Sequence, residues 1–157
     1  MPFGSFTSGS VRGMEYLVAL LTTLALSLPD MTGQPIPDLT RLPSFEVVDH
    51  LEEAVFAHTG QQAGAVLTTA AYLPRENVIL VTTKLFNDLP ELEAVLVHEL
   101  IHWWQVSSRG THLHGGQAWE EEARAYENLW RGEHGLRLRR TGISPATPRG
   151  ADGVRGG

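Results

Sequence analysis

Two histidines and a glutamate stand at a spacing that can bind a metal ion, inside an apolar stretch of the chain. Residues 94–106 read AVLVHELIHWWQV and are apolar except at His98, Glu99, His102 and Gln105. A helix of this composition must be buried, and a buried imidazole or carboxylate is costly unless it is paired, hydrogen-bonded or bound to a metal. These polar residues therefore require a chemical explanation.

On a helix, the spacing of the two histidines turns both imidazoles to one face. At about 3.6 residues per turn, positions four apart lie about 40° apart around the axis, so His98 and His102 can chelate one ion. Glu99 is offset by about 100° from His98 and is suited to hold a metal-bound water. The H-E-x-x-H pattern predicts Glu99 as the general base that takes the proton of this water. The alternative, two core histidines paired with carboxylates, requires strong partners.

A catalytic zinc site usually has three protein ligands and one open position. The chain has no cysteine, so the ligands must be His, Asp or Glu, and zinc is the favoured metal where two imidazoles take part. Gln105 and Ser108 stand where the metzincin motif requires glycine and histidine, which excludes that branch. The run 120–127, EEEARAYE, offers a glutamate on a second helix that can return after a loop at 108–116.

The residues around both helices resemble a known class of enzymes, the gluzincin branch of zinc metallopeptidases, which includes thermolysin-like enzymes. The resemblance is closer to small bacterial single-domain proteins in which an apolar helix and a β-hairpin precede H-E-L-x-H-x-x-Q and a later E-x-x-A-Y. This chain reads HELIHWWQ over 98–105 and EARAY over 122–126. The layout matches over about 14–131, while the specific residues match only in the two helices.

The resemblance implies His98, His102 and Glu122 as the zinc ligands. The competing candidates for the third ligand are Glu121 and Glu120. Thermolysin-like enzymes place an aspartate one turn after the ligand glutamate to orient the first histidine, and here that position holds Tyr126. Glu127 or a backbone carbonyl is then the candidate partner of His98.

The elements that must position these residues can be read from periodicity and from turn signals. They are a helix over 17–28 that ends at Pro29, a strand at 44–48, a helix at 49–58 capped by Asp49, a hairpin of 65–72 and 78–82, a helix over 90–107 capped by Asp88, and a helix over 117–131. This order predicts an α+β fold, a minimal zincin-like domain. We expect the small sheet or hairpin to pack on the H-E-x-x-H helix and on the second, glutamate-bearing helix.

The expected domain covers residues 14–140, with a flexible N-terminus at 1–13 and a disordered tail at 141–157. In zincin-like enzymes an edge strand above the site binds an extended peptide, and residues 78–82 are the candidate strand. By this analogy the chain is a zinc metallopeptidase with peptide or protein substrates. The alternative is a non-catalytic binding or regulatory module that retains the metal for stability. A fourth protein ligand, His112 or His114, would favour that alternative.

Charge and hydropathy limit the other partners. The net charge of −6 and a pI near 5.6 argue against a nucleic-acid partner. The arginines at 131, 137, 139 and 140 are interpreted as the solvated end of a helix. The apolar run 17–28 is too short for a stable membrane span. A core helix and a cytoplasmic location are favoured over a signal peptide and secretion, because Arg12 is the one positive charge before the run and Glu15 opposes it. The sequence leaves the oligomeric state open.

Overall fold

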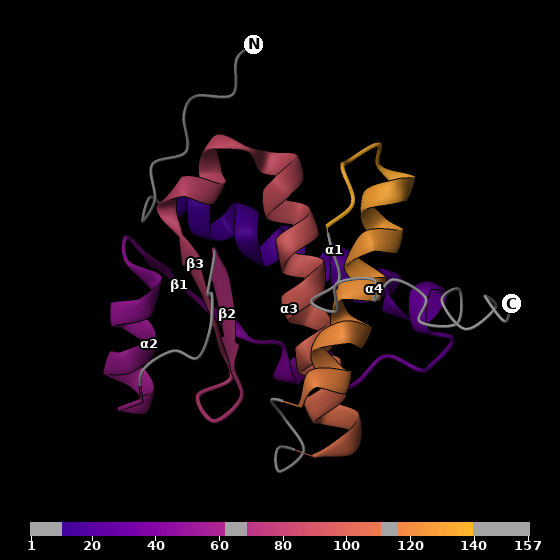
Figure 1. Cartoon of the computed structure of the whole chain (residues 1–157), viewed down its shortest axis with the longest axis horizontal. Coiled ribbons are helices and arrows are strands. Elements are labelled where there is room, and N and C mark those ends of the chain that lie inside the picture. Colours follow the sequence, from indigo (N-terminus) through magenta and orange to yellow (C-terminus); the bar gives the residue numbers. More distant parts are fainter. Residues whose placement is uncertain (1–10, 62–68, 111–115, 140–157) are drawn as a thin grey trace, which may run out of the picture.

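Helices surround a small mixed sheet in the computed structural model, which describes residues 11–61, 69–110 and 116–139 (Figure 1). The described elements are α1 (Val11–Thr32), η1 (Leu39–Arg41), β1 (Ser44–Val48), α2 (Leu51–Thr59), β2 (Ala70–Leu73), β3 (Val78–Thr82), η2 (Thr83–Asn87), α3 (Leu89–Arg109) and α4 (Gln117–Glu133). The predicted α+β class is confirmed. The expected tail at 141–157 and the first part of the expected hairpin, up to residue 68, lie outside the described residues.

The sheet has the strand order β1-β3-β2, in which β1 runs parallel to β3 and β2 antiparallel to it. Every residue of β3 is buried, as expected for a central strand with both faces covered. The expectation that 78–82 is an edge strand is therefore wrong, because β1 pairs with its other side. In the part of the chain that the structure describes, the strand of the hairpin that lies at the edge of the sheet is β2.

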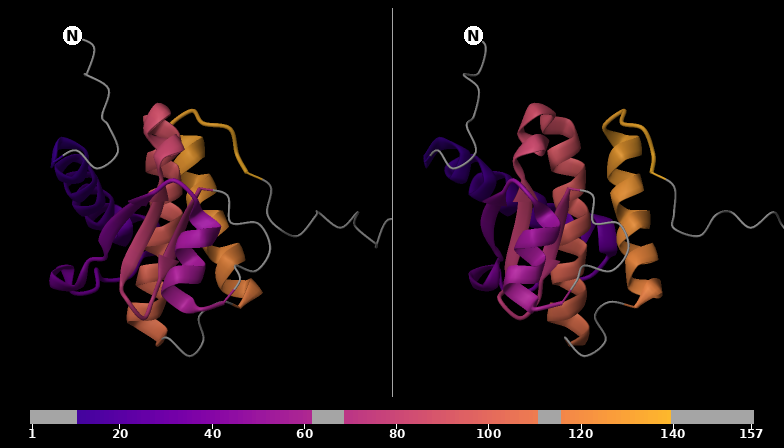
Figure 2. Two further views of the ribbon diagram at one scale, coloured as in Figure 1. Left: turned by 90° about the vertical axis from the view of Figure 1, so that its left-hand side faces the viewer. Right: turned by 60° about the vertical axis from the view of Figure 1, so that its left-hand side comes forward.

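Helix α3 is the central element of the fold. The side chain of Asp88 accepts a hydrogen bond from the backbone N–H of Glu91, which caps the helix as predicted, and Pro90 lies in its first turn. The helix ends at Arg109, and its C-cap is Gly110, whose φ of 91° suits glycine. Figure 2 shows α3 between the sheet and α4. Helix α3 contacts β2, α1 and α4. Its residues are therefore buried almost throughout, from Leu92 to Gln105.

Helix α1 contributes one apolar face to the core. Its buried leucines recur at helical spacing and pack with the residues of α3 and the sheet: Leu17, Leu21, Leu24 and Leu28. The helix does not end at Pro29 as expected but continues to Thr32. Among the described residues, the stretch Gly13–Thr32 is the one helical segment that by length and composition could cross a membrane.

Helix α2 begins one residue later than the expected Asp49 cap would place it, at Leu51. His50 occupies the N-cap position and forms no side-chain capping bond, so Asp49 does not cap this helix as predicted. The helix ends at Thr59, and its C-cap is Gly60, which has a left-handed φ of 68°. Its buried residues, Leu51 and Val55, pack on the face of the sheet opposite α3, against Leu80 among others.

Two leucines on opposite faces of α1 test whether this helix belongs to the core. Leu24 is 2% exposed and Leu26 is 54% exposed. We expect L24A to lower the free energy of unfolding by about 2–5 kcal/mol, because it leaves a cavity. We expect L26A to change it by no more than about 0.5 kcal/mol. Urea denaturation followed by circular dichroism measures both, and equal, small effects would contradict the packing of α1.

Candidate metal centre

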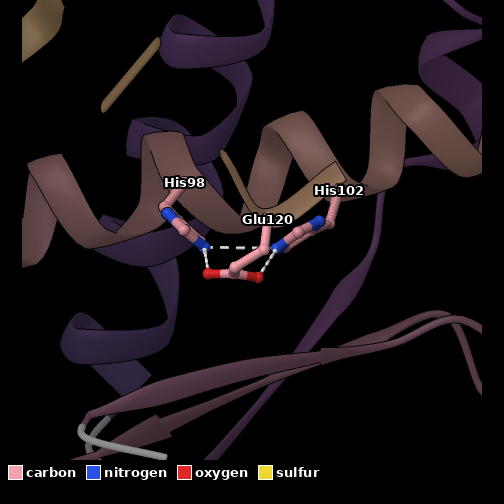
Figure 3. A group of neighbouring side chains, drawn as sticks. All are labelled: His98, His102 and Glu120. Atoms are coloured by element: carbon pink, nitrogen blue, oxygen red, sulfur yellow. Dashed lines mark hydrogen bonds and ion pairs between the residues drawn. The ribbon is translucent and has the colours of Figure 1, made fainter. Parts of the chain in front are cut away.

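Three side chains from α3 and α4 meet at one point: His98, His102 and Glu120 (Figure 3). The Nε2 atoms of the two imidazoles are 3.2 Å apart. The Glu120 carboxylate bridges the two imidazoles: its Oε1 lies 2.8 Å from Nε2 of His98, and its Oε2 lies 3.0 Å from Nε2 of His102. The expected convergence of both histidines on one face of a helix is therefore present, with a carboxylate in front of them.

The amphipathic pattern of α4 brings Glu120 to this point. The residues of α4 that are buried recur every four positions and face the core: Trp119, Ala123, Glu127 and Arg131. Glu120 follows Trp119 and so lies at the edge of this buried face, where its side chain can reach the histidines of α3. Its side chain is 54% exposed, so the cluster is accessible from solvent.

The glutamate expected as the third ligand lies elsewhere. Glu122 forms a two-pronged ion pair with Arg109, at 2.7 and 3.0 Å, and accepts a hydrogen bond of 2.8 Å from Nε2 of Gln105. Two positions along a helix correspond to about 200° around its axis, so Glu120 and Glu122 leave α4 in different directions. The structure therefore brings Glu120, one of the competing candidates for the third ligand, to the two histidines, whereas the side chain of Glu122 lies against Gln105 and Arg109. Glu121 accepts a hydrogen bond from the exposed Gln117.

The Nδ1 atoms of both imidazoles have buried partners. Nδ1 of His98 lies 2.9 Å from Oε1 of Glu127, and Nδ1 of His102 lies 2.9 Å from Oε1 of Gln105. Both partner atoms accept hydrogen bonds, so each Nδ1 carries its proton and donates. In a neutral imidazole the other nitrogen, Nε2, then carries the lone pair. Both rings thus direct the nitrogen that can bind a metal toward the cluster.

Glu127 was one of the two candidate partners for His98, and the structure shows this contact. Its side chain is fully buried, and it is also paired with arginines. Its ion-pair distances are 2.6 Å to Arg124, 2.6 Å to Arg131 and 3.4 Å to Arg139. Burial acts to raise the pKa of Glu127, but hydrogen bonds from His98 and Arg131 outweigh it and leave the pKa lowered. The carboxylate is therefore charged and holds the ring of His98.

The interpretation of Arg131 as part of a solvated helix end is wrong. Its side chain is 3% exposed and connects Glu127 to Glu91 on α3, with Nη2 2.6 Å from Oε1 of Glu91. Arg139 also contacts this oxygen, at 2.7 Å. The hydrogen bond from Arg131 is the largest effect on the pKa of Glu91, which falls to about 2. These ion pairs fasten α4 to the start of α3.

The electrostatics of the cluster favour a positive charge between the three side chains. Burial acts to lower the pKa of His98, but hydrogen bonds to Glu120 and Glu127 outweigh it and raise the pKa to about 9. Hydrogen bonds from His102 and His98 hold the pKa of Glu120 far below its usual value. A divalent cation would satisfy the same charge pattern.

Glu99 lies beside the cluster and not within it, as expected from its offset around the helix. Its side chain faces β2, where Oε2 accepts a hydrogen bond of 2.9 Å from the backbone N–H of Tyr72. The residue is 6% exposed. The expected general base is thus held between α3 and the edge strand of the sheet.

The donor set and its dimensions fit a zinc ion. Tetrahedral zinc with Zn–N bonds of about 2.0–2.1 Å separates neighbouring ligand atoms by roughly 3.3 Å. The two Nε2 atoms are 3.2 Å apart, and the Glu120 oxygens lie at 2.8 and 3.0 Å from them. Small adjustments would therefore seat an ion on these three residues. His112 and His114, the candidates for a fourth ligand, lie outside the described residues.

Sequence reasoning missed the part played by Gln105, although a signal was present. The residue is a lone amide in an apolar run, and it is fully buried. A buried amide must satisfy its hydrogen bonds, so its position three residues after His102 indicated a partner within the site. Trp103 and Trp104 are buried in the core.

No protein-family model matches the chain, and neither does any curated protein or solved structure.

Neighbouring glutamates of α4 provide a direct test of the ligand register. Mutating a residue that holds a metal ligand, without binding the metal itself, typically lowers metal affinity by roughly 10–100-fold. We expect E120A, which removes a proposed ligand, to weaken zinc binding by more than this. E122A should weaken it less, because Glu122 is paired with Arg109 and does not face the two imidazoles. Competition with a chromophoric chelator measures both affinities. A larger loss in E122A than in E120A would restore the register expected from the sequence.

The low pKa of Glu91 predicts a contribution to stability that depends on pH. A lowered carboxyl pKa stabilises the fold above the unfolded value of about 4.5, and this stabilisation is lost as the pH falls toward about 2. We expect E91Q to destabilise the metal-free protein at pH 7 and to have a smaller effect at pH 3. Urea unfolding at both pH values tests this, with E76Q on the exposed turn as the control. An effect of E91Q that is independent of pH would contradict the ion pair with Arg131.

Proposed function

We propose that the protein is a zinc-dependent hydrolase, a metallopeptidase whose ion is held by His98, His102 and Glu120 and whose general base is Glu99. One observation carries the proposal. Both imidazoles present Nε2 to the same carboxylate while a buried acceptor holds each Nδ1. Fixing the ring in this way is what protein metal sites do to their histidine ligands.

The arrangement of charges supports hydrolysis rather than a purely structural role for the metal. When bound, zinc supplies Lewis-acid activation of a water molecule at neutral pH. Three protein ligands leave one coordination position open, as in catalytic zinc sites. Glu99 adjoins these ligands without belonging to them, and its carboxylate can take a proton from the water.

The edge strand β2 supports a peptide as the substrate. Among the described residues, β2 has only β3 as a strand neighbour, and it packs against α3 beside the cluster. The N–H of Tyr72 is directed to Glu99 on this side. An extended peptide can add to such an edge by backbone pairing. The scissile carbonyl would then lie near both the general base and the metal ligands.

Replacing the general base separates catalysis from metal binding. We expect E99Q to retain about one zinc per chain and to lose turnover by about 10²–10⁴-fold, since proton transfer contributes that much to rate. Cleavage of a mixed peptide library, followed by mass spectrometry, measures turnover, and elemental analysis measures zinc. E121Q is the matched control on α4, because the side chain of Glu121 is hydrogen-bonded to the exposed Gln117 and not to the cluster.

Two results would contradict this function. Zinc-loaded wild-type protein that cleaves no member of the library would favour a non-catalytic module that keeps the metal for stability. Undiminished cleavage by E99Q would show that Glu99 is not the base. The E121Q control shows whether the loss of any carboxylate near the site lowers the rate.

A further inference from the structure

We infer that Gln105 is a positioning residue that sets two of the three proposed ligands at once, His102 and Glu120, and that Glu122 and Arg109 hold it in place. This inference rests on the proposed metal centre. Gln105 lies on α3, three residues after His102, and its side chain is completely buried between α3 and α4. The amide of Gln105 accepts a hydrogen bond from Nδ1 of His102, just as the carboxylate of Glu127 accepts one from Nδ1 of His98.

The amide of Gln105 contacts both ligand helices. Its Oε1 accepts from Nδ1 of His102 at 2.9 Å. Its Nε2 donates to the backbone carbonyl of Trp119 at 2.9 Å and to Oε1 of Glu122 at 2.8 Å. These two acceptors flank Glu120 in the sequence, one residue before it and two after it. A single side chain thus orients one imidazole and fixes the turn of α4 that carries the carboxylate.

Only an amide satisfies all three contacts. Gln105 must accept one hydrogen bond and donate two, which matches the carbonyl oxygen and the NH₂ group of glutamine. Leucine would fill a similar space but leave Nδ1 of His102 without this acceptor. Glutamate could accept from His102, but it would place a second carboxylate against Glu122 and against the carbonyl of Trp119. Both changes should loosen the site, for different reasons.

Arg109 and two tryptophans hold the outer end of this connection. The guanidinium of Arg109 is paired with both oxygens of Glu122. It also lies over the rings of Trp104 and Trp119, at 5.1 and 5.6 Å from their centroids. Cation–π contact and the ion pair therefore restrain Arg109 together. Glu122 is thereby held where it can accept from Gln105, which gives it a role in the site without metal contact.

Zinc affinity of paired variants tests the inference. We expect Q105L to bind zinc about 10–100-fold more weakly than wild type, the cost of losing a partner of a metal-bound histidine. Q105E should be at least as weak, because it sets two carboxylates against each other. The exchange variant Q105E/E122Q should recover part of the loss, because positions 105 and 122 then carry one carboxylate between them instead of two. Q117L is the matched control, since Gln117 is an exposed glutamine of α4 whose side chain donates to Glu121.

A spectroscopic readout separates positioning of His102 from a general loss of structure. In the cobalt-substituted protein, each ligating imidazole should give one exchangeable, shifted N–H signal from its Nδ1 proton. We expect Q105L to shift one of the two signals or to speed its exchange with solvent, while the signal of His98, which Glu127 holds, stays unchanged. E122Q serves as a second variant in case Q105L folds poorly, because Glu122 is only partly buried. It should shift the N–H signal of His102 or speed its exchange in the same way, but to a smaller extent.

The outcomes distinguish this inference from the proposed function. Zinc affinity of Q105L within about twofold of wild type would overturn the inference and leave the metal centre intact. Loss of both N–H signals together would also overturn it, because the effect would not be specific to His102. Wild-type protein that binds no zinc would overturn the metal centre and this inference with it. Zinc binding without peptide cleavage would contradict only the hydrolase.

Discussion

Burying polar groups in the middle of the core costs free energy, and this cost governs how the helices and the sheet of this protein pack. Helix α3 carries His98, Glu99, His102 and Gln105 through the centre of the fold, and each is almost or completely buried. A buried polar group without a partner costs free energy comparable to a large part of the net stability of a domain. The surrounding elements supply the partners, and this requirement decides how they are arranged.

Helix α4 meets most of this requirement. It brings Glu120 to both imidazoles, Glu127 to His98 and the carbonyl of Trp119 to Gln105. Arg131 is buried and neutralises Glu127, and it also pairs with Glu91 at the start of α3. The ion pairs that compensate the buried charge of Glu127 therefore also join α4 to α3. The sheet supplies the remaining partner, the backbone N–H of Tyr72 for Glu99.

Sequence patterns predicted the elements better than their contacts. Helical periodicity and the Asp88 cap predicted α3, and the H-E-x-x-H spacing predicted the convergence of its two histidines. The third member of the cluster could not be chosen from the sequence. The side chains of consecutive glutamates on a helix are about 100° apart around its axis, so the rotation of α4 relative to α3 decides that Glu120 faces the histidines. The same limit applies to Arg131, whose burial depends on contact with Glu91, far away in the sequence. The central place of β3 likewise depends on its pairing with β1.

A crystal structure of the zinc-loaded protein, with anomalous diffraction at the zinc edge, would show which side chains bind the ion. The proposed metal centre predicts one anomalous peak per chain, at about 2.0–2.2 Å from Nε2 of His98, Nε2 of His102 and a carboxylate oxygen of Glu120, with a water as the remaining ligand. A peak bound by Glu122, a fourth protein ligand in place of the water, or no peak between α3 and α4 would contradict it.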